Sequence, residues 1–127
     1  MLLKHIAVEC SSEKNSDNFY EKLLGLNKIN SKILSPALTK QIFGLDSEYK
    51  IINYMDDKIH FEVFISNQKA YEKKTIEHVC LEVDDLKVFM KQCENLAANI
   101  IQIPKGESSL TFISDYDGNL FEIKEKQ

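Results

Sequence analysis

Two histidines and two glutamates have the residue types and the spacing of a metal site. His5 and Glu62 lie in the first half of the chain, and His78 and Glu122 lie in the second. Each histidine opens an apolar run, and each glutamate lies between apolar residues in the run that closes its half. Imidazole nitrogens and carboxylate oxygens together suit divalent transition metals. We therefore expect the two halves to direct one histidine and one glutamate each toward a single ion.

The elements that must position these residues follow the same order in both halves, strand, helix, strand, strand, strand. Apolar alternation bounded by turn residues predicts the strands. They are expected at residues 3–10, 27–34, 49–55, 59–66, 76–83, 99–103, 110–114 and 120–126. Helices are expected after the polar segment 11–17 and after Asp84-Asp85, with a helical turn at 36–44 and a non-helical turn at 104–106. The fold class is therefore α+β with a duplicated βαβββ module.

One domain of 127 residues is expected, because the length is typical of a single core. The first module covers about 1–66 and the second about 76–127. The polar segment at about 67–75 carries few apolar residues, so we expect a linker there.

Side chains on a strand alternate between the two faces of a sheet. In the four runs that hold the candidates, one phase is apolar and the other carries the histidines and glutamates. We expect the apolar phase to pack under the helices and the other phase to line a concave polar site. The alternative is that this second face is merely exposed to solvent.

Four further residues lie near the candidates. His60 is in phase with Glu62 and is either a further ligand or a group that supports the ligands. Cys80, two residues after the second histidine, is either apolar filler or a thiol contact. Tyr54 and Phe112 are candidate walls of a pocket.

Composition excludes several classes of protein. The net charge of −4 argues against nucleic-acid binding, which depends on excess basic residues. No apolar run reaches the length of a membrane span, and the N-terminus lacks the features of a signal peptide. Three cysteines without a CxxC spacing predict neither a disulfide framework nor a zinc knuckle. A cytoplasmic protein with no nucleic-acid or membrane partner is expected.

The chain contains no arginine, so all sixteen basic residues are lysine. Arginine is the usual residue for bidentate binding of carboxylates and phosphates. Recognition of an anionic ligand must therefore use lysine, backbone amides or a metal ion. A nucleotide bias toward lysine codons explains this composition as well as functional selection does.

Several stretches resemble the vicinal oxygen chelate superfamily, which includes glyoxalase I, bleomycin-resistance proteins, fosfomycin-resistance proteins, methylmalonyl-CoA epimerase and extradiol dioxygenases. The most specific is Asp-Tyr-Asp-Gly-Asn-Leu-Phe-Glu-Ile at 115–123, although the family usually has proline where this chain has Tyr116. The other resembling stretches are 3–7, 19–26, 76–79 and 83–86. The resemblance implies an open mixed-sheet cup with helices on its outer face. It also implies a homodimer and one divalent ion, Ni, Co, Zn or Mn.

Carried over by position, the resemblance implies His5, Glu62, His78 and Glu122 as metal ligands. Four ligands of this kind are the pattern of glyoxalase I. Dioxygenases and fosfomycin enzymes use two histidines and one glutamate, and the epimerase has glutamine at the position of Glu62. Glu62 therefore favours a lactoylglutathione lyase-like enzyme within the superfamily.

The implied reaction is proton transfer in a small hemithioacetal of a 2-oxoaldehyde, or a related 2-hydroxycarbonyl, through a metal-bound enediolate. Glu122 is the first candidate for the catalytic base and Glu62 the second. Glutathione-type enzymes hold the carboxylates of the tripeptide with arginines. Because this chain has no arginine, the identity of the thiol in its substrate is left open. The alternatives are a small-molecule or antibiotic binding protein of the same fold, with or without metal, and a small dioxygenase.

Overall fold

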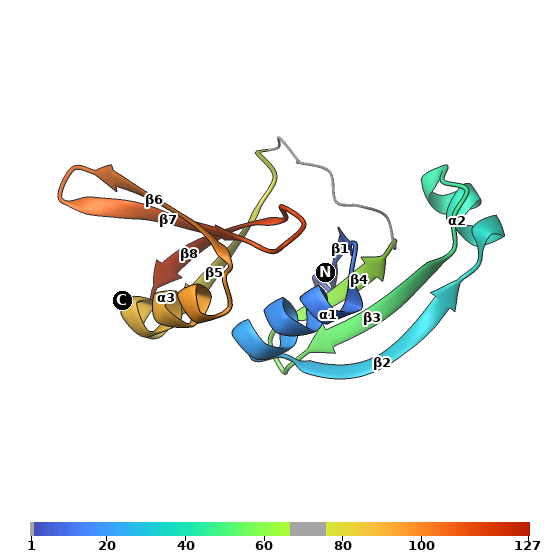
Figure 1. The fold of residues 1–127 in the computed structure, drawn as a ribbon, viewed down its shortest axis with the longest axis horizontal. Coiled ribbons are helices and arrows are strands. Elements are labelled where there is room, and N and C mark those ends of the chain that lie inside the picture. The colour runs from blue at the N-terminus through green and yellow to red at the C-terminus, as the bar shows by residue number, and fades with distance from the viewer. Residues whose placement is uncertain (1, 67–75) are drawn as a thin grey trace. The chain divides into compact units, whose positions relative to one another are not determined.

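The computed structural model describes residues 2–66 and 76–127. The chain forms two compact units, Met1–Ala70 and Tyr71–Gln127, and each contains one four-stranded sheet (Figure 1). The linker expected at 67–75 lies outside the described residues. In the described part of the chain, no helix is both long and apolar enough to cross a membrane.

The first unit is built on a mixed sheet with strand order β1-β4-β3-β2. The pair β1–β4 is parallel, whereas β2–β3 and β3–β4 are antiparallel. The strands are β1 (Ile6–Cys10), β2 (Asn27–Leu34), β3 (Tyr49–Met55) and β4 (His60–Ile65).

The second unit repeats this arrangement with strand order β5-β8-β7-β6, again with one parallel pair, β5–β8. The strands are β5 (Val79–Val83), β6 (Asn99–Lys105), β7 (Ser108–Ser114) and β8 (Leu120–Glu125). The α+β class and the repeated βαβββ order expected from the sequence are confirmed.

A helical segment covers one face of the first sheet (Figure 1). It starts as α1 (Glu13–Ser16), where the Ser12 hydroxyl caps the helix by accepting from the Asn15 amide at 3.2 Å. It continues as a π-helical segment, η1 (Asp17–Leu23). The ring of Tyr20, which is fully buried, lies 5.2 Å from that of Phe61 in β4. The apolar phase of the strands therefore forms the core under this helix, as expected.

The helix α3 (Leu86–Asn95) has the same place in the second unit. The Asp85 carboxylate caps it by accepting from the amide of Val88 at 2.9 Å. Phe89 and Cys93 are buried, but the side chain of Val88 is 58% exposed. Val88 therefore lies outside the inward face that Phe89 occupies, because neighbouring helical residues point about 100° apart.

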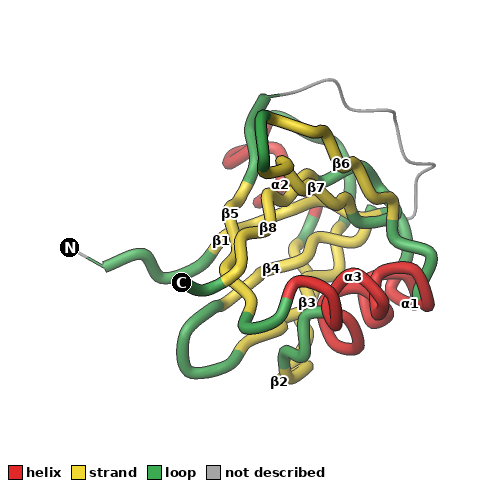
Figure 2. The backbone as a smooth tube through the Cα atoms, turned by 90° about the vertical axis from the view of Figure 1, so that its left-hand side faces the viewer, coloured by secondary structure: helices red, strands yellow, loops and turns green. Residues whose placement is uncertain are grey.

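A further helix, α2 (Pro36–Phe43), connects β2 to β3. It begins with Pro36 after a Ser35 cap and ends at Gly44, whose φ of 72° suits glycine. This helix lies at the far end of the β2–β3 pair, away from α1 (Figures 1 and 2). In the second unit a tight turn through Gly106 joins β6 to β7 instead.

Several strand boundaries differ from the expectation. Pro104 lies inside β6 and not in a turn. The outermost strand of a sheet tolerates proline because one side of its backbone needs no partner, and β6 is such a strand. The first and fifth strands begin later than expected, so that His5 and His78 each stand directly before their strand.

Candidate metal and substrate site

His5 and Glu62 form a close pair in the first unit. The imidazole Nε2 lies 3.2 Å from the carboxylate Oε2, with His5 43% and Glu62 17% exposed. The sheet positions them, because β1 and β4 run parallel and Glu62 lies opposite Ala7, two residues after the histidine. Residues two apart on a strand share a face, so the imidazole and the carboxylate project to the same side.

His78 and Glu122 form the corresponding pair in the second unit. Their Nε2 and Oε2 atoms are 3.6 Å apart, and the side chains are 36% and 17% exposed. Glu122 lies opposite Cys80 in the parallel β5–β8 pair, and Cys80 is two residues after His78. The two units therefore hold the same pair of groups in the same register and with equal exposure of the carboxylate. Whether both pairs share one ion stays a prediction.

The tautomer of His78 bears on what the second pair can bind. Its Nδ1 lies 2.8 Å from the carbonyl oxygen of Ile76. A carbonyl only accepts hydrogen bonds, so Nδ1 carries the proton and a neutral ring presents a lone pair at Nε2. That lone pair faces the carboxylate of Glu122, and two acceptors repel each other unless a positive charge lies nearby. Lys124 Nζ supplies one such charge, 3.8 Å from Glu122 Oε1. A proton or a divalent cation between the two acceptors would satisfy them directly, and a hydrogen-bonded Nδ1 is typical of a metal-binding histidine.

A chain of polar side chains lies beside the first pair. The rings of His5 and His60 are 5.7 Å apart in an edge-on arrangement. His60 Nε2 lies 2.7 Å from Asn53 Oδ1, and Asn53 Nδ2 donates to Asn30 Oδ1 at 2.8 Å. Because Asn53 uses its amide nitrogen toward Asn30, its oxygen accepts from His60, which therefore carries a proton on Nε2. His60 thus has a structural partner on the sheet.

The second unit has apolar side chains at the corresponding positions. Phe112 lies opposite Glu122 in the β7–β8 pair, as Asn53 lies opposite Glu62 in β3–β4. The Phe112 ring contacts the His78 ring edge-on at 5.5 Å. The surroundings of the pair are therefore polar in the first unit and apolar in the second. Phe112 lies beside the second pair, as expected for a wall of the site.

Tyr54 does not line the candidate face, and that expectation is wrong. Its side chain is fully buried on the helix side of the sheet, and its hydroxyl donates to Asp17 Oδ1 at 2.8 Å. Burial and this hydrogen bond raise the pKa of Tyr54 far above its usual range. Strand alternation explains the placement, because Tyr54 is in the opposite phase to Asn53.

Cys80 lies on the candidate face beside Glu122. Partial burial, followed by the charge of that carboxylate, raises the pKa of the Cys80 thiol. A raised pKa keeps the group protonated near neutral pH and lowers its reactivity as a nucleophile. The position fits a contact in the site better than a filler of the core.

Solved structures share this fold at low sequence identity. A glyoxalase family protein from Enterococcus faecalis matches with a TM-score of 0.71 at 18% identity, over 96% of this chain and 95% of that one. The fosfomycin resistance protein FosX from Listeria monocytogenes, complexed with Mn(II) and sulfate, matches with a TM-score of 0.72 at 14% identity, over 98% and 90%. FosX from Mesorhizobium loti matches with a TM-score of 0.70 at 12% identity, over 98% and 91%. No protein-family model matches the chain, and no curated protein does.

The chain has the vicinal oxygen chelate fold. The sequence stretches named above resemble proteins of this same fold.

Within this fold, the turn before β8 positions Glu122. The carboxylate of Asp115 accepts from the amides of Asp117 and Asn119 at 3.0 and 2.9 Å, and Gly118 has a φ of 84°. The hydroxyl of Tyr116 donates to the carbonyl of Leu96 at the end of α3. A tyrosine in place of the usual proline therefore fixes this turn by a hydrogen bond to the helix.

Three residues beside the first pair were not expected from the sequence. Asn53 and Asn30 form the polar chain described above, and Phe43 reaches the same sheet face from α2. Asn53 had a usable signal, since the short β3–β4 hairpin places it opposite Glu62. Phe43 had none, because the direction of a helix between two strands depends on tertiary packing.

Proposed function

We propose that this protein is a metal-dependent lyase or isomerase of the glyoxalase I type. His5, Glu62, His78 and Glu122 would hold one divalent ion. The observation that supports the proposal is the repeated register, in which each unit directs one imidazole Nε2 and one carboxylate oxygen to the same face. A merely solvent-exposed face has no reason to repeat both residue types at one register.

The donor set fits a divalent transition metal. Two imidazoles and two carboxylates leave positions for substrate or water in a six-coordinate shell, which suits Ni²⁺, Co²⁺, Mn²⁺ or a high-coordinate Zn²⁺. The lone pair that His78 presents toward Glu122 supports the same assignment. FosX from Listeria monocytogenes, a structural neighbour, was solved with Mn(II). When bound, the ion would polarise the oxygens of the substrate and stabilise negative charge on them.

The two glutamates would carry the proton. In a hemithioacetal of a 2-oxoaldehyde, the carbon that bears the hydroxyl and the sulfur loses a proton, and the neighbouring carbonyl carbon gains one. Glu122 is the first candidate to take and return this proton, and Glu62 is the second. Each side chain is 17% exposed, so each carboxylate is partly shielded from water yet open to a ligand.

A metal titration followed by an exchange assay tests the proposal. We expect calorimetry to show one divalent ion per chain, and Glu122→Gln to lower turnover about 10²- to 10⁴-fold, the usual contribution of a general base. Loss of proton exchange at the substrate carbon would be followed by NMR in deuterated water with a panel of thiol hemithioacetals. Glu107→Gln, which removes an equal charge from the exposed β6–β7 turn, is the matched control.

One result would contradict this function, and another would reassign the base. A protein without affinity for any of the four ions would not be a metalloenzyme. Full turnover in Glu122→Gln, with Glu62→Gln inactive, would move the role of base to Glu62.

The structural neighbours support a second candidate, an antibiotic resistance activity like that of FosX. Fosfomycin carries a phosphonate, and a dianion of this kind is commonly held by arginine, which this chain lacks. Incubation with fosfomycin and Mn²⁺, followed by phosphorus NMR, separates the candidates. Consumption of the antibiotic would favour the resistance activity, and its persistence would favour the isomerase.

We further propose a cytoplasmic homodimer. None of the three cysteines, all of which lie within the described residues, forms a disulfide, as is usual in a reducing compartment. Members of this superfamily commonly complete their site by dimerisation. Sedimentation at micromolar concentration tests the dimer, and a purely monomeric protein would refute it. Fractionation of cells that produce the protein tests the location.

A further inference from the structure

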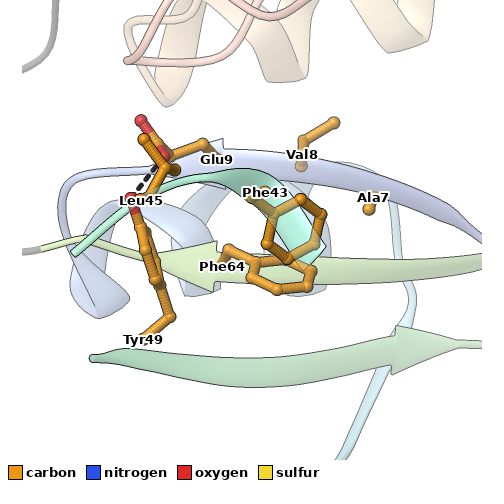
Figure 3. Close-up of a pocket in the computed structure, with 7 residues that line it drawn as sticks. All are labelled: Ala7, Val8, Glu9, Phe43, Leu45, Tyr49 and Phe64. Atoms are coloured by element: carbon orange, nitrogen blue, oxygen red, sulfur yellow. Dashed lines mark hydrogen bonds between the residues drawn. The ribbon is translucent and has the colours of Figure 1, made fainter. Parts of the chain in front are cut away.

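A cavity of about 190 Å³ opens on the first unit beside the His5–Glu62 pair (Figure 3). Ala7, which lies opposite Glu62, is part of its wall. Phe64, two residues after Glu62 and on the same face, forms another part. An apolar cavity of about 150 Å³ is sufficient to bind benzene. The cavity is therefore large enough for a ring-sized substituent of a molecule held by the pair.

Three of the seven residues that line this pocket are aromatic. Phe43 meets Phe64 edge-on, with ring centroids 5.7 Å apart and an interplanar angle of 84°. Tyr49 meets Phe64 on the other side at 6.1 Å. Figure 3 shows the Phe43 ring above the Phe64 ring, with the Tyr49 hydroxyl reaching toward Glu9. Ring faces carry partial negative charge and attract cations as well as apolar groups.

A carboxylate lies at one end of the pocket. Glu9 Oε2 accepts a hydrogen bond from the hydroxyl of Tyr49 at 3.0 Å. Burial and this hydrogen bond raise the pKa of Tyr49, so the phenol stays protonated and keeps donating. The hydrogen bond fixes the carboxylate beside the rings, and none of the described residues that line the pocket is cationic. The pocket is therefore suited to a positive group and unsuited to an anion.

The pocket is a feature of the first unit. Phe43 ends α2 and Leu45 follows it, whereas the second unit has the tight turn at Gly106 in place of this helix. The metal-binding pair is repeated in both units, but the pocket depends on an element that only one of them has. A pocket in one unit is better suited to recognising a particular substrate than to the metal chemistry proposed for the pair that both units repeat.

We propose that this pocket binds a ring-sized apolar substituent that carries a protonated amine, with the ring against Phe43 and Phe64 and the ammonium group at Glu9. The substrate would then be a neutral or cationic carbonyl compound and not a conjugate of an acidic thiol peptide. The statement about the substrate rests on the function proposed above. The binding of an aromatic amine to the pocket is independent of that function.

Three probes of equal size test the pocket in the absence of metal: benzylamine, benzyl alcohol and benzoate. Titrations followed by amide NMR with a chelator present give their dissociation constants. We expect benzylamine to bind about three- to tenfold more tightly than benzyl alcohol, from the cation–π and ion-pair contributions, and benzoate to bind most weakly. Shifts should centre on Phe43, Phe64 and Tyr49.

Variants separate the charge from the shape of the pocket. Glu9→Gln removes the ion pair and should reduce the preference for benzylamine over benzyl alcohol to the part that the aromatic rings contribute. Tyr49→Phe keeps the carboxylate but removes the hydrogen bond that fixes it, so it should reduce the preference for the amine less than Glu9→Gln does. Glu48→Gln, which removes an exposed charge next to Tyr49 but outside the lining, should change nothing.

Equal binding of all three probes to the wild-type protein, or the absence of shifts at the three rings, would overturn the proposal. A preference for the amine that is as large in Glu9→Gln as in the wild-type protein would also overturn it. Because these titrations contain no metal, a protein that binds benzylamine as expected but binds no divalent ion would refute only the enzymatic function.

Discussion

Glu122 lies directly opposite Cys80 in the parallel β5–β8 pair, and Cys80 is two residues after His78 in the sequence. Glu62 has the same relation to Ala7 and so to His5. A register kept in both units indicates that the two histidine–glutamate pairs have equivalent roles.

Replacing either histidine should therefore weaken metal binding to a similar degree. We expect His5→Ala and His78→Ala each to lower the affinity for Co²⁺ or Mn²⁺ by at least about 10- to 100-fold, because even groups that only support a ligand contribute this much. Calorimetry on the wild-type protein should give one ion per chain. Two ions per chain, with each variant losing one and retaining the other, would show that the pairs bind separately.

The environment of Cys80 can be measured without any activity. The carboxylate of Glu122 and partial burial raise the pKa of this thiol, so Glu122→Gln should lower the pKa and increase the thiolate fraction. We expect iodoacetamide to modify Cys80 in this variant roughly twofold faster or more at pH 8, with a chelator present. Mass spectrometry of digested samples at successive times gives the rates.

Cys93 provides an internal reference in the same experiment. It is fully buried, and burial raises its pKa to about 11, so it should stay unmodified in the folded protein. Glu107→Gln should leave the rate at Cys80 unchanged, because its carboxylate is in the β6–β7 turn. An unchanged rate in Glu122→Gln would mean that Cys80 and Glu122 are not neighbours in solution.

The strands and their faces were predictable because alternation has a period of two and turn residues mark the ends. This is why His60 and Glu62 were placed together on one face, and Phe61 on the other. The register between β1 and β4 was not predictable. It joins strands some fifty residues apart, and a shift by one residue would have placed Glu62 beside a residue of the opposite phase.

The pocket beside the first pair was also beyond prediction. Residues 36–44 signal a helix through Pro36 and Gly44, but local signals do not say which sheet face the end of that helix covers. The contact of Phe43 with Phe64 is settled by tertiary packing. The position of Tyr54, in contrast, was predictable, since a correct strand phase would have placed its side chain in the core.

The polar chain beside His5 should stabilise the fold and fix the tautomer of His60. Asn53→Ala removes the acceptor for His60 Nε2–H and should lower the free energy of unfolding by about 1 kcal/mol, the usual net value of such a hydrogen bond. Urea unfolding measures this loss. Nitrogen chemical shifts of the His60 ring should also change, because the Nε2–H form loses its partner.

Asn30→Ala is the control for this chain. It removes only the acceptor of the Asn53 amide and leaves the bond to His60 in place. The His60 shifts should therefore stay close to those of the wild-type protein. If Asn30→Ala and Asn53→Ala changed the His60 shifts equally, the hydrogen bond between His60 and Asn53 would not be the cause.

The ion pairs that hold α1 to the sheet should make stability depend on pH. Hydrogen bonds from Lys50 and Lys28 lower the pKa of Glu13 below its ordinary value of 4.5. A carboxyl group with a lowered pKa in the folded state contributes stability that is fully present above 4.5 and is lost as the pH falls through the folded-state value. Glu13→Gln should therefore lower the urea midpoint at pH 7, by an amount that shrinks toward zero as the pH falls below 4.5. Added salt should also reduce the difference at pH 7 because these side chains are partly exposed.

Glu21→Gln removes an equal charge from an exposed position of η1 and serves as the control. A difference between Glu13→Gln and the wild-type protein that stays constant from pH 7 to pH 3 would show that packing, and not these ion pairs, causes the loss.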